Sequence, residues 1–425
     1  MKRVLRVTGQ GKVKDVGLRG LATVPAAEDV DSTVALIQAL IPVGLTAVAE
    51  TLEAEVVALA GEWYRRTGGQ PGLVRWSQER GSVYLADQKL PITYTRVRDL
   101  PGNREEVPLR TYQRLQQPRQ ADRGVLLRVL RGLSCRAYAE CAEAVPAAFG
   151  LSPSTISRRF IRASARQLQR LCERRLEGYD FVALFLDGKT FADDAMVIAL
   201  GVTLRGEKVV LGFVQTATEN ERVCAAFLRG LLERGLRVDQ GLLCLLDGAK
   251  GLRKAIQTVF GSQAAVQRCQ WHKRENVVSY LPTAQQATWR RKLQVAYGQP
   301  TYPEAKAALQ RLRRELTLLN SSAAASLEEG LEETLTLHRL GLVEGLGRSL
   351  TTTNCLESIM AQLGQRTDKV DRWRSSDQKQ RWVATALLDL EPRLRRIKGY
   401  RHLPLLRAAL TRETFGLLGR EAIGA

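Results

Sequence analysis

Three acidic residues that lie far apart in the chain have side chains and sequence settings suited to metal-assisted chemistry. Asp187 follows the apolar run 181–186, Asp247 follows the apolar run 242–246, and each acid precedes a glycine. Such runs are typical of strands buried on both faces, and an acid at the end of one is exposed at the rim of the sheet. Glu357 lies beside the apolar stripe of a helix expected from about Asn354. If the two strands are neighbours, the carboxylates converge and suit a hard cation such as Mg²⁺.

The chemistry that such a cluster supports is phosphodiester cleavage with two Mg²⁺ or Mn²⁺ ions held about 3.5–4 Å apart. Two other interpretations stay open on spacing alone. Asp187 with Gly188 is a turn dipeptide that would suit a β-hairpin. Asn354 with Glu357 has the spacing of a helix capping box.

Two other motifs are weaker. Cys269 and His272 have zinc-like spacing, but no second Cys/His pair stands at a convincing distance, so we expect a structural role for them. Trp271, between them, is expected in the core. Gly188-Lys189-Thr190 mimics the end of a phosphate-binding P-loop, but Ala183 stands where that motif needs glycine, which excludes it.

The charge of the chain points to a polyanionic partner. Lys and Arg number 64 against 44 Asp and Glu, a formal net charge of +20. Residues 101–175 hold 15 cations and 6 acids, and residues 251–300 hold 8 cations and 1 acid. Clustered cations favour nucleic acid, because each neutralised phosphate releases counterions. A solvated arginine-rich surface is the alternative; we expect double-stranded DNA.

The length of 425 residues suits two to four domains of roughly 100–200 residues. No apolar run approaches the roughly 18 residues of a membrane span, and the basic start lacks the apolar core of a secretory signal. Seven scattered cysteines form no disulfide framework, which favours a reducing compartment. We therefore expect a cytoplasmic protein with no membrane partner.

The N-terminal half is expected to be largely helical. The pattern over residues 32–66 predicts two helices, because Pro42 interrupts it. Alternation over residues 74–97 predicts a β-hairpin. Three helices are expected over residues 125–175, the second carrying Tyr138, Cys141 and Val145.

The third of these helices has the start signals of a DNA-reading helix. Gly150 supplies a turn, Ser152 a cap and Pro153 a first helical residue, which together are typical of a helix-turn-helix. Ile156 and Phe160 would pack inward. The residues expected to face DNA are Ser154, Thr155, Ser157, Arg158 and Arg159.

From Asp180 the pattern changes to an α/β alternation. Strands are predicted over residues 181–186, 195–204, 209–214, 242–246 and 264–269, with helices at 221–236 and after 250. This order predicts a mixed sheet with helices on it. Residues 275–345 are helical again, with a glycine-punctuated linker at 341–349.

Four segments in this order carry a resemblance to a known family: Phe185-Leu-Asp187-Gly, Leu245-Leu-Asp247-Gly-Ala-Lys-Gly-Leu, Arg268-Cys-Gln-Trp-His272-Lys-Arg and Thr351-Thr-Thr-Asn354-Cys-Leu-Glu357-Ser. The chain resembles the Mutator-type family of bacterial insertion-sequence transposases. The resemblance implies a DNA transposase with an RNase H-like α/β core, interrupted by an all-helical insertion. It also implies two-metal DNA strand cleavage and strand transfer, binding of terminal inverted repeats, and a homodimer or higher synaptic assembly at the bacterial nucleoid.

The resemblance assigns Asp187, Asp247 and Glu357 as the catalytic triad that ligates both ions, with Cys269 and His272 as a family signature. The cations then expected at DNA phosphates are Lys250, Arg268, Lys273, Arg274, Arg372, Arg374 and Arg381. Two alternatives are an RNase H-like nuclease without strand transfer and a non-catalytic DNA-binding regulator.

The residue patterns and the resemblance together divide the chain into five segments, and the helix-turn-helix assignment rests on the pattern alone. Residues 1–105 form an N-terminal helical segment plus β-hairpin, and 106–178 a helix-turn-helix-like DNA-binding domain. Residues 179–275 form the first part of the core, 276–345 the helical insertion, and 346–425 the second part of the core with C-terminal helices.

Overall fold

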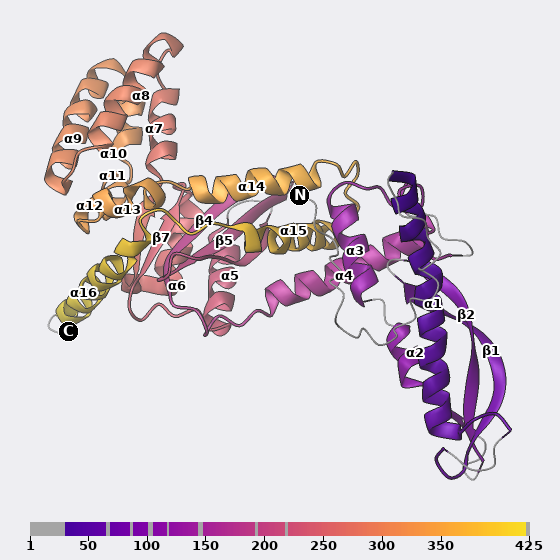
Figure 1. Cartoon of the computed structure of the whole chain (residues 1–425). Coiled ribbons are helices and arrows are strands. Elements are labelled where there is room, and N and C mark those ends of the chain that lie inside the picture. The colour runs from indigo at the N-terminus through magenta and orange to yellow at the C-terminus, as the bar shows by residue number, and fades with distance from the viewer. Residues whose placement is uncertain are drawn as a thin grey trace, which may run out of the picture. The chain divides into compact units, whose positions relative to one another are not determined.

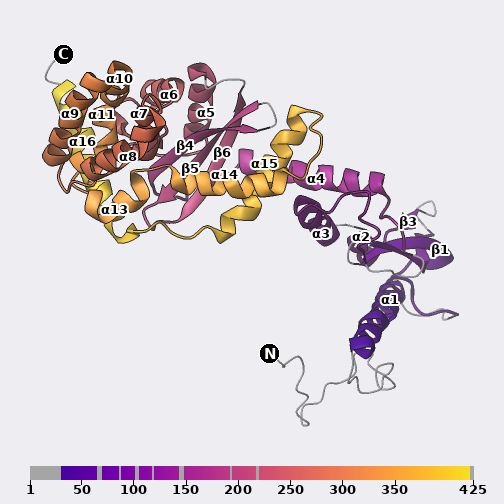
Figure 2. The same ribbon diagram turned by 90° about the horizontal axis from the view of Figure 1, so that it is seen from above.

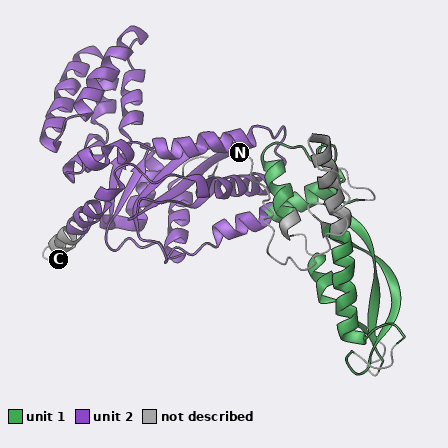
Figure 3. Ribbon diagram, in the orientation of Figure 1, with its two compact units in different colours: residues 1–163 green, residues 164–425 purple. Residues whose placement is uncertain are grey.

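The computed structural model describes residues 30–421 apart from 65–68, 86–87, 101–104, 117–118, 143–147, 192–193 and 217–219. The chain divides into two compact units, residues 1–163 and 164–425 (Figure 3). The division falls inside one helix, α4 (Pro153–Cys172). In the described part, no helix is both long and apolar enough to cross a membrane.

Unit 1 contains a β-ribbon packed against a long helix. The helix is α1 (Val30–Ala60), and the strands β1 (Leu73–Leu85), β2 (Gln88–Asp99) and β3 (Glu106–Val107) pair antiparallel. Leu52 and Val56 of α1 pack with Val97 and Leu109. The predicted hairpin is confirmed, but the predicted break at Pro42 is wrong, because one helix continues through it. A proline removes one backbone donor, and tertiary packing supplies most of a helix's stability.

The rest of unit 1 is helical but differs from the predicted three-helix pattern. It comprises α2 (Arg110–Leu115), α3 (Arg119–Leu130) and the start of α4. Residues 135–141 form turns instead of the second predicted helix, and Val145 lies outside the described residues. Tyr138 is buried and accepts a hydrogen bond from Arg128 at 3.1 Å, a contact that a turn can make. Ile156 and Phe160 of α4 are buried, as predicted.

Unit 2 is built on a five-stranded mixed sheet, which confirms the α/β prediction (Figure 1). Its strands are β4 (Phe181–Phe191), β5 (Asp194–Thr203), β6 (Lys208–Thr216), β7 (Leu242–Leu246) and β8 (Ala264–Arg268), in the order β6-β5-β4-β7-β8. The first three pair antiparallel, whereas β4, β7 and β8 run parallel. Helices α5 (Glu221–Glu233) and α6 (Lys250–Phe260) make the crossovers that parallel strands require.

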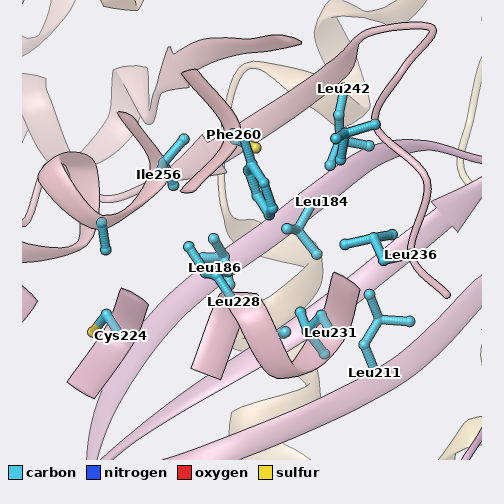
Figure 4. Packing of buried hydrophobic residues seen from close by; sticks show 14 of the residues in the cluster. Leu184, Leu186, Leu211, Cys224, Leu228, Leu231, Leu236, Leu242, Ile256 and Phe260 are labelled. Atoms are coloured by element: carbon cyan, nitrogen blue, oxygen red, sulfur yellow. The ribbon is translucent and has the colours of Figure 1, made fainter. Parts of the chain in front are cut away.

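Helices cover both faces of this sheet. Figure 2 shows α5 and α6 on one face and α14 (Asn354–Thr367) and α15 (Ser376–Leu390) on the other. The core under α5 and α6 contains Leu184 and Leu186 of β4, packed with Leu228, Ile256 and Phe260 (Figure 4). Because side chains alternate along a strand, the residues between these leucines face α14 and α15.

The segment between β8 and α14 is helical, as predicted. It consists of α7 (Gln270–Ser279), α8 (Thr283–Tyr297), α9 (Tyr302–Leu319), α10 (Ser321–Glu328), α11 (Leu331–Thr334), α12 (Thr336–Arg339) and α13 (Val343–Leu350). The predicted linker 341–349 is wrong, since most of it is α13. Gly345 serves close packing, because a Cβ there would lie 2.7 Å from His402. The chain ends with η3 (Glu391–Arg393), η4 (Tyr400–His402) and α16 (Leu403–Glu421), and η2 (Gly261–Gln263) precedes β8.

The helical segment has its own core, and its stability should depend on it. We expect Leu309→Ala, on a fully buried side chain of α9, to lower the free energy of unfolding by about 2–5 kcal/mol. Leu318→Ala on the same helix, where the side chain is 88% exposed, should change it by less than about 0.5 kcal/mol. Urea unfolding followed by circular dichroism tests this; equal effects of the two substitutions would contradict the packing.

Candidate active site

Asp187 and Asp247 follow neighbouring positions of two paired strands. Strand β4 pairs parallel with β7, and the last pair is Leu186 with Leu246. The two aspartates are therefore the next residues on adjacent strands, at the same end of the parallel pair. The prediction that Asp187 ends its strand is wrong, because β4 continues to Phe191 and stays paired with β5. Strand β7 ends at Leu246, so from Asp187 onward β4 is paired only with β5.

The face of the sheet on which Asp187 lies is set by its neighbours. Leu184 and Leu186 belong to the core under α5 and α6, so the alternation of the strand directs buried Asp187 to the face that α14 covers. Asp247 lies in the turn after β7, where its Oδ1 accepts a hydrogen bond from the backbone N–H of Ala249 at 3.0 Å. This bond holds the carboxylate at the turn.

Glu357 lies in the first turn of α14, which packs on β4. The hydroxyl of Thr353, the residue before the helix, donates a hydrogen bond to Glu357 Oε1 at 3.0 Å. The helix begins at Asn354 with Thr353 as its N-cap, and the cap makes no side-chain bond to the backbone. The capping box that Asn354 and Glu357 suggested therefore does not form.

Thr353 contacts Cys269, His272 and Glu357 and so connects the three side chains. Thr353 Oγ1 lies 3.3 Å from His272 Nδ1, the backbone N–H of Thr353 donates to Cys269 Sγ at 3.4 Å, and His272 Nε2 lies 3.8 Å from Glu357 Oε1. The hydrogen bond with Cys269 raises the pKa of His272 to about 9 in spite of burial, and the charges of Asp187 and Glu357 act in the same direction. The imidazole thus lies within the field of two of the predicted catalytic acids.

The chemistry of these donors suits Mg²⁺, because three carboxylates offer only hard oxygen ligands. Among the residues that the structure describes, no group of three or more His, Cys, Asp or Glu side chains is arranged to hold a metal ion. Cys269 and His272 both contact Thr353. The three carboxylates therefore fit Mg²⁺ in the chemistry of their donor atoms.

Arg268 and Lys273, both predicted at phosphates, are buried. Arg268, the last residue of β8, joins the helical segment to the sheet, whereas Lys273 of α7 bonds within that segment. Lys273 Nζ donates to the carbonyl of Ser326, in the last turn of α10, at 2.7 Å and to that of Glu329, the C-cap of α10, at 2.6 Å. Arg268 donates to the same Glu329 carbonyl at 3.1 Å. Cations stabilise a helix C-terminus, where unpaired carbonyls carry partial negative charge. These side chains are committed inside the protein instead of being presented at its surface.

Arg268 also lies against the turn that carries Asp247. Gly248 has φ +115°, and a Cβ there would lie 2.2 Å from Arg268 Nε. A Cβ on Gly330, after α10, would lie 2.5 Å from Arg268 Nη1. Only glycine leaves room for the guanidinium on both sides. The helical segment is thereby packed through Arg268 against the residue that follows Asp247.

The other predicted DNA contacts are divided between the surface and the interior. Arg381 is buried and bonds to Asp377 at 2.8 Å and to Ser164 at 3.0 Å. Arg159 of α4 is buried and bonds to Asp122 at 3.0 Å. Trp271, expected in the core, is 40% exposed. The residues that remain exposed or partly exposed are Ser154, Thr155, Ser157, Arg158, Lys250, Arg274, Arg372 and Arg374.

The sequence analysis did not identify Thr353 as part of the site or Lys273 as a buried residue, although features of the sequence indicate both. Thr353 immediately precedes a predicted helix, which is where hydroxyl residues recur. Gln270, Lys273 and Val277 are all buried and follow the three- and four-residue spacing of one helix face. That spacing places Lys273 on the inward face of α7.

The chain is similar to known proteins over most of its length. Residues 43–395 match the family model described as "Transposase, Mutator family". The chain is 27% identical over 361 residues to the transposase for insertion sequence element IS905 of Lactococcus lactis, which covers 81% of this chain and 87% of that protein. It is 27% identical over 245 residues to the transposase for IS6120 of Mycolicibacterium smegmatis, with 56% and 74% covered. The transposase for IS406 of Burkholderia multivorans is 31% identical over 212 residues, with 48% and 52% covered.

The buried ammonium of Lys273 should give the protein a specific pH dependence. Burial lowers the pKa of Lys273 to about 8, whereas a lysine of an unfolded chain has a pKa of about 10.4. Between those values the unfolded state binds more protons, so the free energy of unfolding rises with pH. Relative to Lys273→Met, the wild type should gain roughly 1–3 kcal/mol between about pH 7.5 and about pH 10.

Urea unfolding at several pH values measures this difference. Lys254→Met, on an exposed lysine of α6, is the matched control and should show no such pH dependence. A constant difference between wild type and Lys273→Met across the range would contradict the burial of the charge.

Proposed function

Because the chain belongs to the Mutator family of transposases, we propose that it binds the ends of an insertion sequence and cleaves and joins DNA strands with Asp187, Asp247 and Glu357. The observation that carries this proposal is the in-register parallel pairing of β4 with β7, because Asp187 and Asp247 directly follow its last pair, Leu186 with Leu246. The third acid lies on α14, the helix that packs on β4.

The fold supports a catalytic core of the RNase H-like kind that the family implies. The mixed sheet of unit 2 is followed by a separate helical segment, α7–α13, which lies in the chain between Asp247 and Glu357. Those helices have a core of their own. In this proposal residues 276–345 are an insertion into the core, and residues 346–425 complete it.

Asp187, Asp247 and Glu357 are the residues that would hold two Mg²⁺ or Mn²⁺ ions. When bound, the ions would lower the pKa of the attacking water or hydroxyl and neutralise the charge that develops on the phosphate. The protein's own part is to orient its carboxylates, through Ala249 N–H at Asp247 and Thr353 at Glu357. His272 contributes positive charge beside Asp187 and Glu357, which offsets the repulsion between the acids.

The proposed reaction has two phosphoryl-transfer steps. In the first, water attacks the phosphodiester at the element end, the P–O3′ bond breaks, and a 3′-hydroxyl is released. In the second, that hydroxyl attacks a target phosphodiester, and the target strand's own 3′-oxygen leaves with a proton. Neither step oxidises or reduces any group, and neither requires a covalent protein–DNA intermediate.

Recognition of the terminal repeats is proposed for unit 1. Ser154 and Arg158 are exposed on α4, while Ile156 and Phe160 bury the opposite face of the helix. An arrangement with apolar residues inward and Ser and Arg outward supports contact with DNA, in the manner of a helix-turn-helix recognition helix. Two element ends must meet for joining, so we also propose a homodimer or higher assembly that works at the DNA of the bacterial cell.

The triad is tested by removing one acid at a time. Asp187→Ala, Asp247→Ala and Glu357→Gln should each reduce Mg²⁺-dependent cleavage of end-containing DNA by 10³-fold or more, on the order expected when a ligand of a two-metal site is lost. Binding of the same DNA should change less than about threefold, because non-specific affinity comes from cations. Cleavage assays and gel-shift titrations measure the two quantities.

Products separate the proposal from its alternatives. Joined strands support a transposase, whereas cleaved but never joined ends would identify a nuclease. End binding without metal-dependent cleavage by the wild type would identify a regulator. Wild-type rates in any single variant would remove that acid from the site.

The hydrogen bond from Thr353 predicts a positioning role for this residue. Thr353→Val keeps the shape of the side chain but removes the donor to Glu357 Oε1, so we expect the single-turnover cleavage rate at saturating DNA to fall roughly tenfold or more. DNA affinity should not change, and Thr353→Ser, which keeps the hydroxyl, should restore the rate.

Thr351→Val is the matched control for this substitution. The Thr351 hydroxyl donates to the Gly347 carbonyl at 2.6 Å and not to a carboxylate. A rate loss in Thr351→Val equal to that in Thr353→Val would show a general effect on folding at the start of α14 instead of a specific one.

A further inference from the structure

A cluster of cations lies on the segment between η3 and η4, outside every site described above. Five basic residues occur within nine positions, at Arg393, Arg395, Arg396, Lys398 and Arg401. All five are exposed. We call residues 393–401 the basic loop. It lies wholly within unit 2.

The backbone of the basic loop is fixed in place by the rest of unit 2. Ile397 is buried, and its N–H donates to the carbonyl of Gly206 at 3.0 Å. The hydroxyl of Ser349 donates to the carbonyl of Lys398 at 3.0 Å. Gly399 has φ +79°, and a Cβ there would lie 2.0 Å from the carbonyl oxygen of Gly345. A loop held in one conformation loses little entropy when it binds a partner.

The positive charge of the loop is only partly neutralised within the protein. Arg393 bonds to Asp389, whose carboxylate also bonds to Arg366. Arg396 lies 3.6 Å from Glu207. For Arg395, Lys398 and Arg401, the described part of unit 2 provides no carboxylate partner. Like charges held this close repel one another, so an external anion would stabilise them.

Tyr400 adds a hydroxyl to this cluster. Hydrogen bonding to the Arg401 guanidinium lowers the pKa of Tyr400, and Arg396 acts in the same direction. The Arg396 guanidinium lies 5.5 Å from the centre of the Tyr400 ring. Guanidinium and hydroxyl groups are hydrogen-bond donors of the kind that bind the oxygens of a phosphate.

The basic loop lies at the end of the sheet opposite the candidate active site. It contacts the β5–β6 turn through Gly206, and that turn adjoins the start of β4, where Leu204 N–H donates to the Asp180 carbonyl. Asp187 lies six residues further along β4 than Phe181, which is about 20 Å at the rise of an extended strand. The cations of the basic loop are therefore a group separate from the carboxylate of Asp187.

We propose that the basic loop is a second DNA-binding surface, which takes the phosphate backbone of duplex DNA at a distance from the reacting strand. This inference rests on the proposed function, in that DNA is the ligand. Phosphate oxygens repeated along a backbone match several spaced cations, and such contacts add affinity that is independent of sequence. The loop would hold flanking or target DNA while the carboxylates act on the element end.

The test is the salt dependence of DNA binding by the full-length protein. The probe is a duplex that carries the element end with flanking DNA, and the variant is Arg395→Gln/Lys398→Gln/Arg401→Gln. Each lost phosphate contact should reduce the slope of log affinity against log salt by about 0.9, so the triple variant should lose roughly 2 to 3 in slope. At low salt its affinity should fall about tenfold or more.

Two control proteins make this result specific. Arg229→Gln/Arg237→Gln/Arg314→Gln removes the same charge from exposed arginines elsewhere in unit 2, and it should lose less than about 1 in slope. Arg395→Lys/Arg401→Lys keeps the charge and should retain most of the wild-type slope. Circular dichroism of each variant confirms that it is folded.

The outcomes also separate this inference from the proposed function. The basic-loop variant should cleave at the wild-type single-turnover rate at saturating DNA, because it leaves the three acids unchanged. A wild-type slope in that variant, or an equal loss in the arginine control, would overturn the inference and leave the triad untouched. Loss of slope in a protein that never cleaves DNA would support the surface and count against the catalytic proposal.

Discussion

The parallel pairing of β4 with β7 is the constraint on which the candidate site depends. Leu186 pairs with Leu246 as the last pair, so Asp187 and Asp247 are the next residues where the pairing of β4 with β7 ends. The apolar core under α5 and α6 takes Leu184 and Leu186, and strand alternation then directs Asp187 to the face of α14. Burial of leucine stabilises the fold, whereas burial of a carboxylate does not, so the core orients the acid.

The neighbours of Glu357 show what holds its carboxylate in place. Thr353 donates to one carboxylate oxygen, and His272 lies 3.8 Å from the same oxygen. These residues come from α7 and the start of α14, which are separated in the chain by the whole helical segment. Arg268, at the end of β8, holds that segment against the sheet through the carbonyl of Glu329, and Lys273 of α7 bonds to the same carbonyl from within the segment. The segment is therefore coupled to the site by buried cations.

Residue types and spacing were sufficient to predict the strands of unit 2 and the helix that carries Glu357. They did not predict whether a particular side chain is buried or exposed, and this decides the role of that side chain. Lys273 and Arg381 have the residue type of a DNA contact but are buried and satisfied by carbonyl or carboxylate oxygens. Trp271 has the residue type of a core side chain but is exposed. For Lys273 and Arg381 the buried position brings in neighbours that lie far away in the chain, Ser326 and Ser164.

The sequence by itself determined the strands of unit 2, most of the helices and which acids are candidates, because periodicity and chain order are local properties. It also determined the excess of positive charge. Only the tertiary structure decided which of those charges are available to a partner, since this depends on packing between distant segments. The basic loop illustrates the difference: its cations are visible in the sequence, but their fixed backbone depends on Gly206, Gly345 and Ser349.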